Sequence, residues 1–128
     1  MILDSSAVVE VILKLPRWEY ILEKVIAAKG IGIGAPTLVE SALVIGSRLA
    51  RHPTQIVSDF IREAEIEVIS FTSDHYPIAL DAYERFGKGR HPAGLNFGDC
   101  LTYSICSYAR DSLLFIGQDF MQTDIKVA

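Results

Sequence analysis

Four short apolar runs, separated by longer stretches with helical periodicity, constrain the fold more than any other feature of this sequence. The runs lie near residues 2, 31, 67 and 113. The stretches between them carry apolar residues at intervals of three and four, as helices with one buried face do. Strands that alternate with helices join through crossover connections and form a parallel sheet. We therefore expect an α/β protein with helices on both faces of a central, mainly parallel sheet of four to five strands.

The stretch from Leu95 to Phe120 carries the clearest local signals. Asn96 stands three residues before Asp99, a spacing typical of a helix that Asn96 caps and that has Asp99 in its first turn. The expected buried face of this helix comprises Leu101, Ile105, Tyr108 and Ala109. The apolar run over residues 113–116 then predicts a strand covered on both sides.

Carboxylates follow the expected strands. Asp4 comes directly after the first strand, Glu40 lies in the helix after the second, and Asp119 follows the last. Because ligands bind beyond the carboxyl ends of parallel strands, we expect these three side chains at one edge of the sheet. Asp99 can join them from the start of its helix. Asp124, further along the last loop, is the alternative to Asp119.

Glu40 is expected beside a buried face. Pro36 marks the start of its helix. The apolar stripe of that helix comprises Val39, Ala42, Leu43, Gly46 and Ala50. Helical rotation puts Glu40 about 60° from Leu43 and about 100° from Val39, so its carboxylate should lie away from open water.

Two further helix boundaries are marked. Ser5 and Ser6 are of a residue type that caps helices, and they precede a helix expected over residues 7–14. Gly87 follows a helical stretch in the place where a left-handed residue ends helices.

Carboxylates that stay ionised side by side repel each other, which costs several kilocalories per mole unless a cation compensates. Oxygen ligands with no His or Cys at ligand spacing favour Mg²⁺ or Mn²⁺ over zinc. Such a centre is typical of metal-assisted phosphoryl transfer, in which the metal activates water and neutralises the phosphate. For Asp99 alone, the alternative is a capping acid stabilised by the helix dipole.

Length and charge narrow the function classes. The chain has 128 residues, which predicts one domain over residues 1–128. Twelve Lys and Arg against 16 Asp and Glu give a net charge of −4, which argues against a protein that attracts nucleic acid over its whole surface. Any nucleic-acid site must therefore be local.

The best basic cluster lies in the glycine-rich loop before Asp99. It contains Lys88, Arg90 and His91, with Arg85 just upstream, and a second cluster comprises Arg48, Arg51 and His52. The loop residues are candidates for substrate binding, because Arg can hold a phosphate with two hydrogen bonds. The alternative is a solvated loop without contact to substrate.

The sequence favours a cytoplasmic location without membrane association. The start MILDSS has no basic region or cleavage site, and Glu10 interrupts the nearest apolar run. Cys100 and Cys106 lie six residues apart on one expected helix, which favours reduced packing residues over a disulfide or a metal pair.

Four segments together resemble PIN-domain ribonucleases, specifically the VapC-type toxins of type II toxin–antitoxin pairs: MILDSSA, PTLVESAL, GKGRHPAGLNFGDCLTYSIC and LLFIGQDFMQTDI. The resemblance covers almost the whole chain and implies a PIN-like three-layer α/β/α sandwich. It places Asp4, Glu40, Asp99 and Asp119 in the family's acidic site, as catalytic and metal-binding residues. Ser6 corresponds to the hydroxyl that usually follows the first Asp.

The resemblance also implies an activity and partners. The implied activity is cleavage of RNA with Mg²⁺ or Mn²⁺, and the implied inhibitor is a VapB-like antitoxin. The protein would form a homodimer, or a higher heteromer with the antitoxin, in a bacterial or archaeal cytoplasm. The surface expected to receive the antitoxin is the first helical hairpin, with Val8, Ile12, Trp18 and Leu22.

The sequence leaves open which residue is the fourth acid. The chain has Gly117 and Gln118 where many relatives carry an acid, so Asp119 is preferred as the fourth acid and Asp124 is its alternative.

Two alternatives to a ribonuclease come from other classes of protein. A PIN fold retained only as a binding module would lose acids, whereas Asp4, Glu40 and Asp99 are intact. A phosphotransferase of the haloacid dehalogenase type needs a second acid two residues after the first, and here that residue is Ser6.

Overall fold

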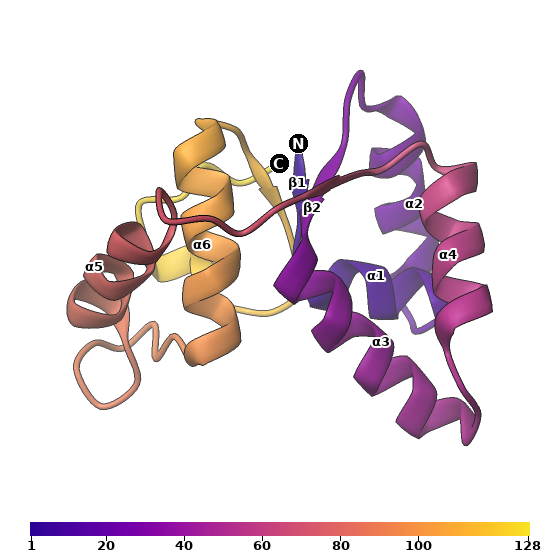
Figure 1. Cartoon of the computed structure of the whole chain (residues 1–128), viewed down its shortest axis with the longest axis horizontal. Helices are drawn as coiled ribbons and strands as arrows, with labels where there is room; N and C mark the ends of the chain where they lie inside the picture. Colours follow the sequence, from indigo (N-terminus) through magenta and orange to yellow (C-terminus); the bar gives the residue numbers. More distant parts are fainter.

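The structure, a computed structural model, describes residues 1–128. Four strands alternate with six α-helices and one short 3₁₀ helix (Figure 1). The strands are β1 (Ile2–Leu3), β2 (Gly32–Gly34), β3 (Glu67–Ile69) and β4 (Leu113–Leu114). The helices are α1 (Ser5–Ile12), α2 (Trp18–Ala27), α3 (Ala35–Leu49), α4 (Thr54–Glu63), α5 (Tyr76–Phe86), α6 (Phe97–Ala109) and η1 (Phe120–Gln122).

The strands form one sheet in the order β3-β2-β1-β4. Every pairing is parallel, with Ile2 of β1 opposite Gly32 of β2 on one side and opposite Leu113 of β4 on the other. The expected α/β class and parallel sheet are confirmed, with four strands. Because β1 lies between β2 and β4, the carboxyl ends of these three strands are neighbours.

Two cores cover the two faces of the sheet. Ile2 and Leu113 belong to a core built with α5 and α6, whereas Leu3 and Leu114 belong to a core built with α1 to α4. Successive strand residues point to opposite faces, so even a two-residue strand contributes to both cores. Figure 1 shows this three-layer arrangement, with α5 and α6 on one side of the strands and α1, α2 and α4 on the other.

Helix ends agree with the sequence in one case and differ in two. Asn96 and Asp99 form the expected capping box of α6. The cap of α1 is Asp4 and not Ser5 or Ser6, since the Asp4 carboxylate accepts from the Ser6 N–H. The prediction of a left-handed residue at Gly87 is also wrong, because the backbone there is extended, with a φ of −69° and a ψ of 159°. Glycine is needed there for space, since a Cβ would lie 2.2 Å from the Tyr83 carbonyl oxygen.

The buried face of α3 differs from the expected apolar stripe. Val39 is 59% exposed and Leu43 is 69% exposed, while Thr37, Ser41 and Ile45 are buried. The Ser41 hydroxyl donates to the Thr37 carbonyl at 2.8 Å, so this polar pair is satisfied inside the protein. Small residues in that row let α3 pack closely, and a periodicity based on apolar side chains does not detect them.

Helix α6 is buried over most of its circumference between α5, α3 and the sheet. Of its expected buried face, Ile105 is buried but Tyr108 is exposed. Cys100 and Cys106 are buried free thiols, as expected. No helix is long and apolar enough to cross a membrane.

Candidate metal centre

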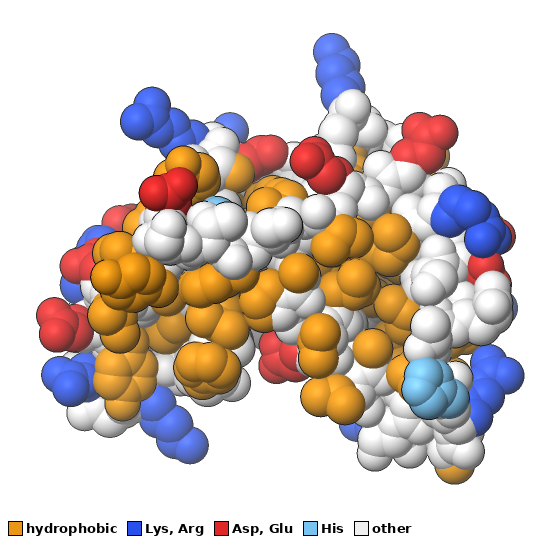
Figure 2. Space-filling view, viewed as in Figure 1, with side chains coloured by type: hydrophobic (Ala, Val, Ile, Leu, Met, Phe, Trp, Pro, Cys, Tyr) orange, Lys and Arg blue, Asp and Glu red, His pale blue; other side chains and the backbone are white.

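Four acidic residues lie around the carboxyl ends of β1, β2 and β4. Asp4 follows β1 directly, Glu40 lies in the second turn of α3 after β2, and Asp119 comes directly before η1, after β4. Asp99 is the third residue of α6. Figure 2 shows a notch between the α6 side and the α3 side of the molecule, with acidic side chains at its base.

The Asp4 carboxylate is fixed by the first turn of α1. It is 5% exposed and accepts hydrogen bonds from the Ser6 N–H at 3.0 Å and the Ser6 hydroxyl at 2.5 Å. The same hydroxyl accepts from the Ile116 N–H at 2.9 Å. Ser6 therefore connects the first acid to the segment after β4 that carries Asp119.

Glu40 lies against the start of α6. A Cβ at Gly98 would stand 2.8 Å from its Oε2 atom, so glycine at this position leaves room for the carboxylate. Burial, followed by the negative charge of Asp4, raises the pKa of Glu40, and a hydrogen bond from Ser5 partly opposes the shift.

Asp99 has the most perturbed carboxylate of the four. Burial raises its pKa from the ordinary 3.8 to about 6, against the lowering effect of the hydrogen bond from the Asn96 N–H. The negative charges of Asp4, Asp119 and Glu40 raise it further, in that order. These charge interactions place the other three acids within electrostatic reach of Asp99.

A buried contact between two helices sets the spacing of Glu40 and Asp99. The hydroxyls of Thr37 on α3 and Thr102 on α6 are hydrogen-bonded at 2.9 Å. Glu40 is one turn after Thr37, and Asp99 is one turn before Thr102. The bond therefore ties together the two helices that present these carboxylates.

No cation compensates this group of acids. The ion pairs of the protein involve other carboxylates, those of Asp111, Asp59, Glu63, Asp81 and Asp124. No three or more His, Cys, Asp or Glu side chains converge closely enough to enclose a metal ion as they stand. The donor set nevertheless suits a hard divalent cation, since it offers carboxylate oxygens whose charge is uncompensated. Binding would require the carboxylates to turn inward.

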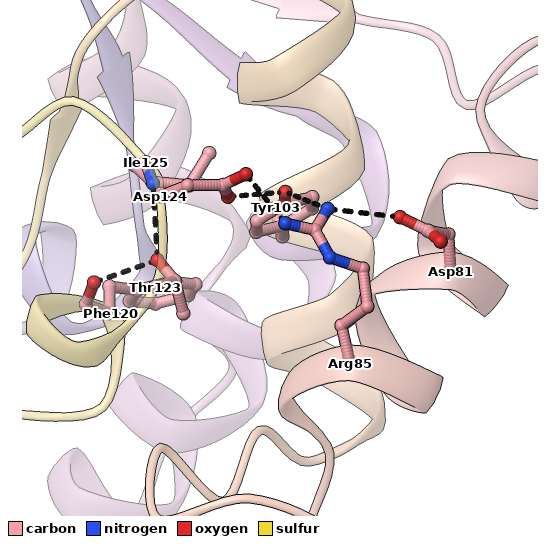
Figure 3. A network of polar contacts seen from close by, with 7 residues as sticks. All are labelled: Asp81, Arg85, Tyr103, Phe120, Thr123, Asp124 and Ile125. Carbon is pink, nitrogen blue, oxygen red and sulfur yellow. Dashed lines mark hydrogen bonds and ion pairs between the residues drawn. The ribbon is translucent and has the colours of Figure 1, made fainter.

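Asp124, the alternative fourth acid, has other partners. Its carboxylate accepts from the Tyr103 hydroxyl at 2.6 Å and from Arg85 at 2.7 Å (Figure 3). These hydrogen bonds, that of Tyr103 first, lower its pKa. Asp124 is also absent from the charges that act on Asp99, whereas Asp119 is among them.

The basic loop leads directly into α6. Lys88 and Arg90 are exposed, and the Arg90 guanidinium lies 5.2 Å from the centre of the Tyr83 ring. His91 stabilises the loop itself, because its Nδ1 atom accepts from the Ala93 N–H at 3.1 Å and its ring packs edge-on against Phe86.

Sequence reasoning missed several residues that position the acids. Sequence patterns do not mark Thr37, Gly98 and Thr102 as site residues, because these residue types do not by themselves indicate a metal site. Their role depends on the packing of α3 against α6. A signal for Gly98 was present, since a glycine in the first turn of a helix lowers helix propensity and needs a reason.

Comparison with known proteins agrees with this architecture. The PIN domain family matches residues 1–126. Ribonuclease VapC36 of Mycobacterium tuberculosis is 36% identical over 127 residues, which cover 98% of this chain and 91% of that protein. The chain belongs to the VapC family of PIN-domain ribonuclease toxins.

Two solved structures share the fold of this protein over almost their whole length. VapC20 of Mycobacterium tuberculosis, a toxin that cleaves the sarcin-ricin loop, superposes with a TM-score of 0.80 at 12% identity, covering 99% of this chain and 97% of that one. A chain of a toxin–antitoxin complex from Klebsiella pneumoniae gives a TM-score of 0.73 at 12% identity, with coverages of 99% and 95%. The expected PIN-like α/β/α sandwich is confirmed.

Proposed function

We propose that this VapC protein is a metal-dependent endoribonuclease that hydrolyses RNA phosphodiester bonds and acts as the toxin of a VapBC-type pair. The observation that carries the proposal is the group of four carboxylates at one sheet edge that no cation compensates. Burial, together with the negative charges of neighbouring acids, raises the pKa of Glu40 and Asp99, which means that the ionised forms of these two carboxylates are disfavoured in the metal-free protein. Such an arrangement is costly for folding alone and is explained by a cationic ligand.

Each acid has a distinct support in the proposed centre. Asp4 and Asp99 stand at the starts of two helices, Glu40 is held beside Gly98, and Asp119 precedes the buried Phe120. Together they would hold Mg²⁺ or Mn²⁺. When bound there, a divalent cation would supply a water of lowered pKa and positive charge for the scissile phosphate. Ser6 orients the Asp4 carboxylate through its hydroxyl.

We propose that RNA approaches past the basic loop. With a net charge of −4, the protein needs a local cationic contact for a polyanion. Arg90 stacked on Tyr83 offers a guanidinium and an aromatic ring on one surface, a pair suited to a phosphate and an unstacked base. Lys88 adds a second charge, whereas His91 supports the loop conformation.

An apolar groove between α2 and α4 is the better candidate for the antitoxin than the surface expected from the sequence. Val8 is fully buried in the core and cannot contact a partner. The groove has a volume of about 400 Å³, and its apolar lining includes Leu22, Ile26 and Phe60. Ile26 is 75% exposed, which suits an amphipathic segment that docks its apolar face.

A homodimer is supported by a different surface. Figure 2 shows a broad hydrophobic band from the α5 side to the α3 side, far larger than isolated exposed apolar residues produce. Leu43 on α3 and Phe97 on α6 are exposed and line one pocket between these helices, and Leu80 on α5 is also exposed. Light scattering of the purified protein measures the oligomeric state directly.

The test of the proposed function is direct. Purified protein is incubated with total RNA and either Mg²⁺, Mn²⁺ or a chelator, and the cut ends are mapped. We expect cleavage only with metal, and none by Asp4→Asn or Glu40→Gln. Cleavage that persists with chelator, or in both variants, would falsify the metal-dependent mechanism. Metal binding without any cleavage would instead indicate a PIN-fold binding module.

A further inference from the structure

A polar network outside the four acids joins α5, α6 and the last segment of the chain. Figure 3 shows the Asp124 carboxylate facing both the Tyr103 hydroxyl and the Arg85 guanidinium. Tyr103 donates to one carboxylate oxygen at 2.6 Å, and Arg85 donates to the other at 2.7 Å. Arg85 also donates to Asp81 at 3.1 Å and to the Tyr103 hydroxyl at 3.5 Å. The two donors thus fix both oxygens of Asp124.

The protein core holds the Tyr103 end of this network, while the side chains of Arg85 and Asp124 are 44% and 54% exposed. Tyr103 is 3% exposed, and its ring lies 5.9 Å from that of Phe86. The Arg85 guanidinium lies over the same Phe86 ring at 4.6 Å. A charge-assisted hydrogen bond to a buried hydroxyl is short and directional, so Asp124 has little freedom relative to α6.

The segment that carries Asp119 is held on both sides. Upstream, the Ile116 N–H donates to Ser6, and Gly117 follows with a φ of +116° that favours glycine. Downstream, Phe120 is buried, and the Thr123 hydroxyl donates to the Phe120 carbonyl at 2.8 Å. Asp124 follows directly. Asp119 therefore lies between the contact with Ser6 and the contact with Tyr103.

We propose that Arg85, Tyr103 and Asp124 form a latch that positions Asp119 against Asp99, so that Asp124 is a positioning residue and not a metal ligand. The inference rests on the proposed function of the four acids. Tyr103 stands on the same helix as Asp99, one turn further along, so the latch fixes the Asp119 segment to the helix that presents Asp99. The position of Asp119 relative to Asp99 is thereby fixed.

If the latch positions Asp119, its loss should change Mn²⁺ affinity only through Asp119. Asp124→Asn keeps the shape but removes the ion pair with Arg85, and Tyr103→Phe removes a single hydroxyl. Each should weaken Mn²⁺ affinity, measured by calorimetry, about fivefold or more. In an Asp119→Asn background, the same changes should cause no further loss, because the residue they position no longer contributes its charge. Asp81→Asn is the matched control, since it also contacts Arg85 but not the last segment.

Hydrogen exchange gives a second readout that does not depend on metal or activity. Both latch variants should exchange the amides of residues 118–123 faster than wild type, and Asp81→Asn should not. Equal losses of Mn²⁺ affinity in the two backgrounds, or unchanged exchange, would overturn the latch. If the wild type neither binds Mn²⁺ nor cleaves RNA, the proposed function fails, and unchanged exchange in the variants then overturns the latch separately.

Discussion

Replacing Asp99 by asparagine separates a metal ligand from a helix cap. In the capping box, the Asn96 N–H donates to the Asp99 carboxylate at 2.9 Å, and the Asp99 N–H donates to the Asn96 side chain at 2.9 Å. An asparagine oxygen can still accept from the Asn96 N–H, and the backbone contact is unaffected. Asp99→Asn therefore removes the charge while it keeps the shape of the cap.

The expected gain in stability follows from the raised pKa of Asp99. In the folded protein the pKa is about 6 against an ordinary 3.8, so the folded state binds more protons than the unfolded state between these values. Stability therefore falls as pH rises from about 4 to about 6 and stays lower above that range. The difference corresponds to about 3 kcal/mol at full burial, and to about 1–2 kcal/mol for this partly exposed group.

Urea unfolding of the metal-free protein measures this gain. At about pH 8, Asp99→Asn should raise the free energy of unfolding by about 1–2 kcal/mol, whereas near pH 4 the gain should vanish. RNA cleavage should be lost at the same time. Asp59→Asn on α4 is the control, because hydrogen bonds from Gln55 and Arg62 lower the pKa of Asp59 and its loss offers no gain. A clear loss of stability at pH 8 in Asp99→Asn, with cleavage retained, would show that Asp99 serves only as a cap.

Three further changes test other parts of the site. Gly98→Ala should displace the Glu40 carboxylate, because the new Cβ would lie 2.8 Å from its Oε2 atom, and should weaken Mn²⁺ binding without unfolding α6. Gly30→Ala is the control, because the space around Gly30 is open. Equal Mn²⁺ affinities of the two variants would contradict the contact between residue 98 and Glu40. Arg90→Ala should weaken RNA binding by about 1–2 kcal/mol and flatten its salt dependence, with Mn²⁺ affinity unchanged. Ile26→Asp should abolish binding of the antitoxin in a pull-down while RNA cleavage persists, and retained binding would place the antitoxin elsewhere.

Local signals in the sequence predict most of the frame of this protein. The capping box of α6 follows from the spacing of Asn96 and Asp99, and the parallel sheet follows from the alternation of short apolar runs with helical stretches. The placement of the four acids around the carboxyl ends of neighbouring strands also follows, because parallel strands bring these ends to one edge. These features depend on residues close in sequence or on general rules of topology.

Features that depend on which side of a helix meets its neighbour could not be predicted. The apolar stripe of α3 pointed to Val39 and Leu43, yet the buried row contains Thr37 and Ser41. The Thr37 hydroxyl meets its partner, the Thr102 hydroxyl, only once α3 packs on α6, whereas the Ser41 hydroxyl bonds within α3. For the same reason the sequence left Asp124 open as the alternative to the preferred Asp119. Their five-residue separation says nothing about Tyr103 and Arg85, which come from two other helices.

The order of the strands also governs when the sheet can form. The central strand β1 comes first in the chain, and one of its two neighbours, β4, comes last. During synthesis, β1 therefore waits for more than a hundred residues before its second edge is covered, and contacts of such long range slow folding. Asp119 emerges after β4, so the complete acidic group cannot assemble while the ribosome is still making the preceding part of the chain. If the four acids form the proposed nuclease centre, a nascent chain cannot cleave RNA before the residues up to Asp119 have been synthesised.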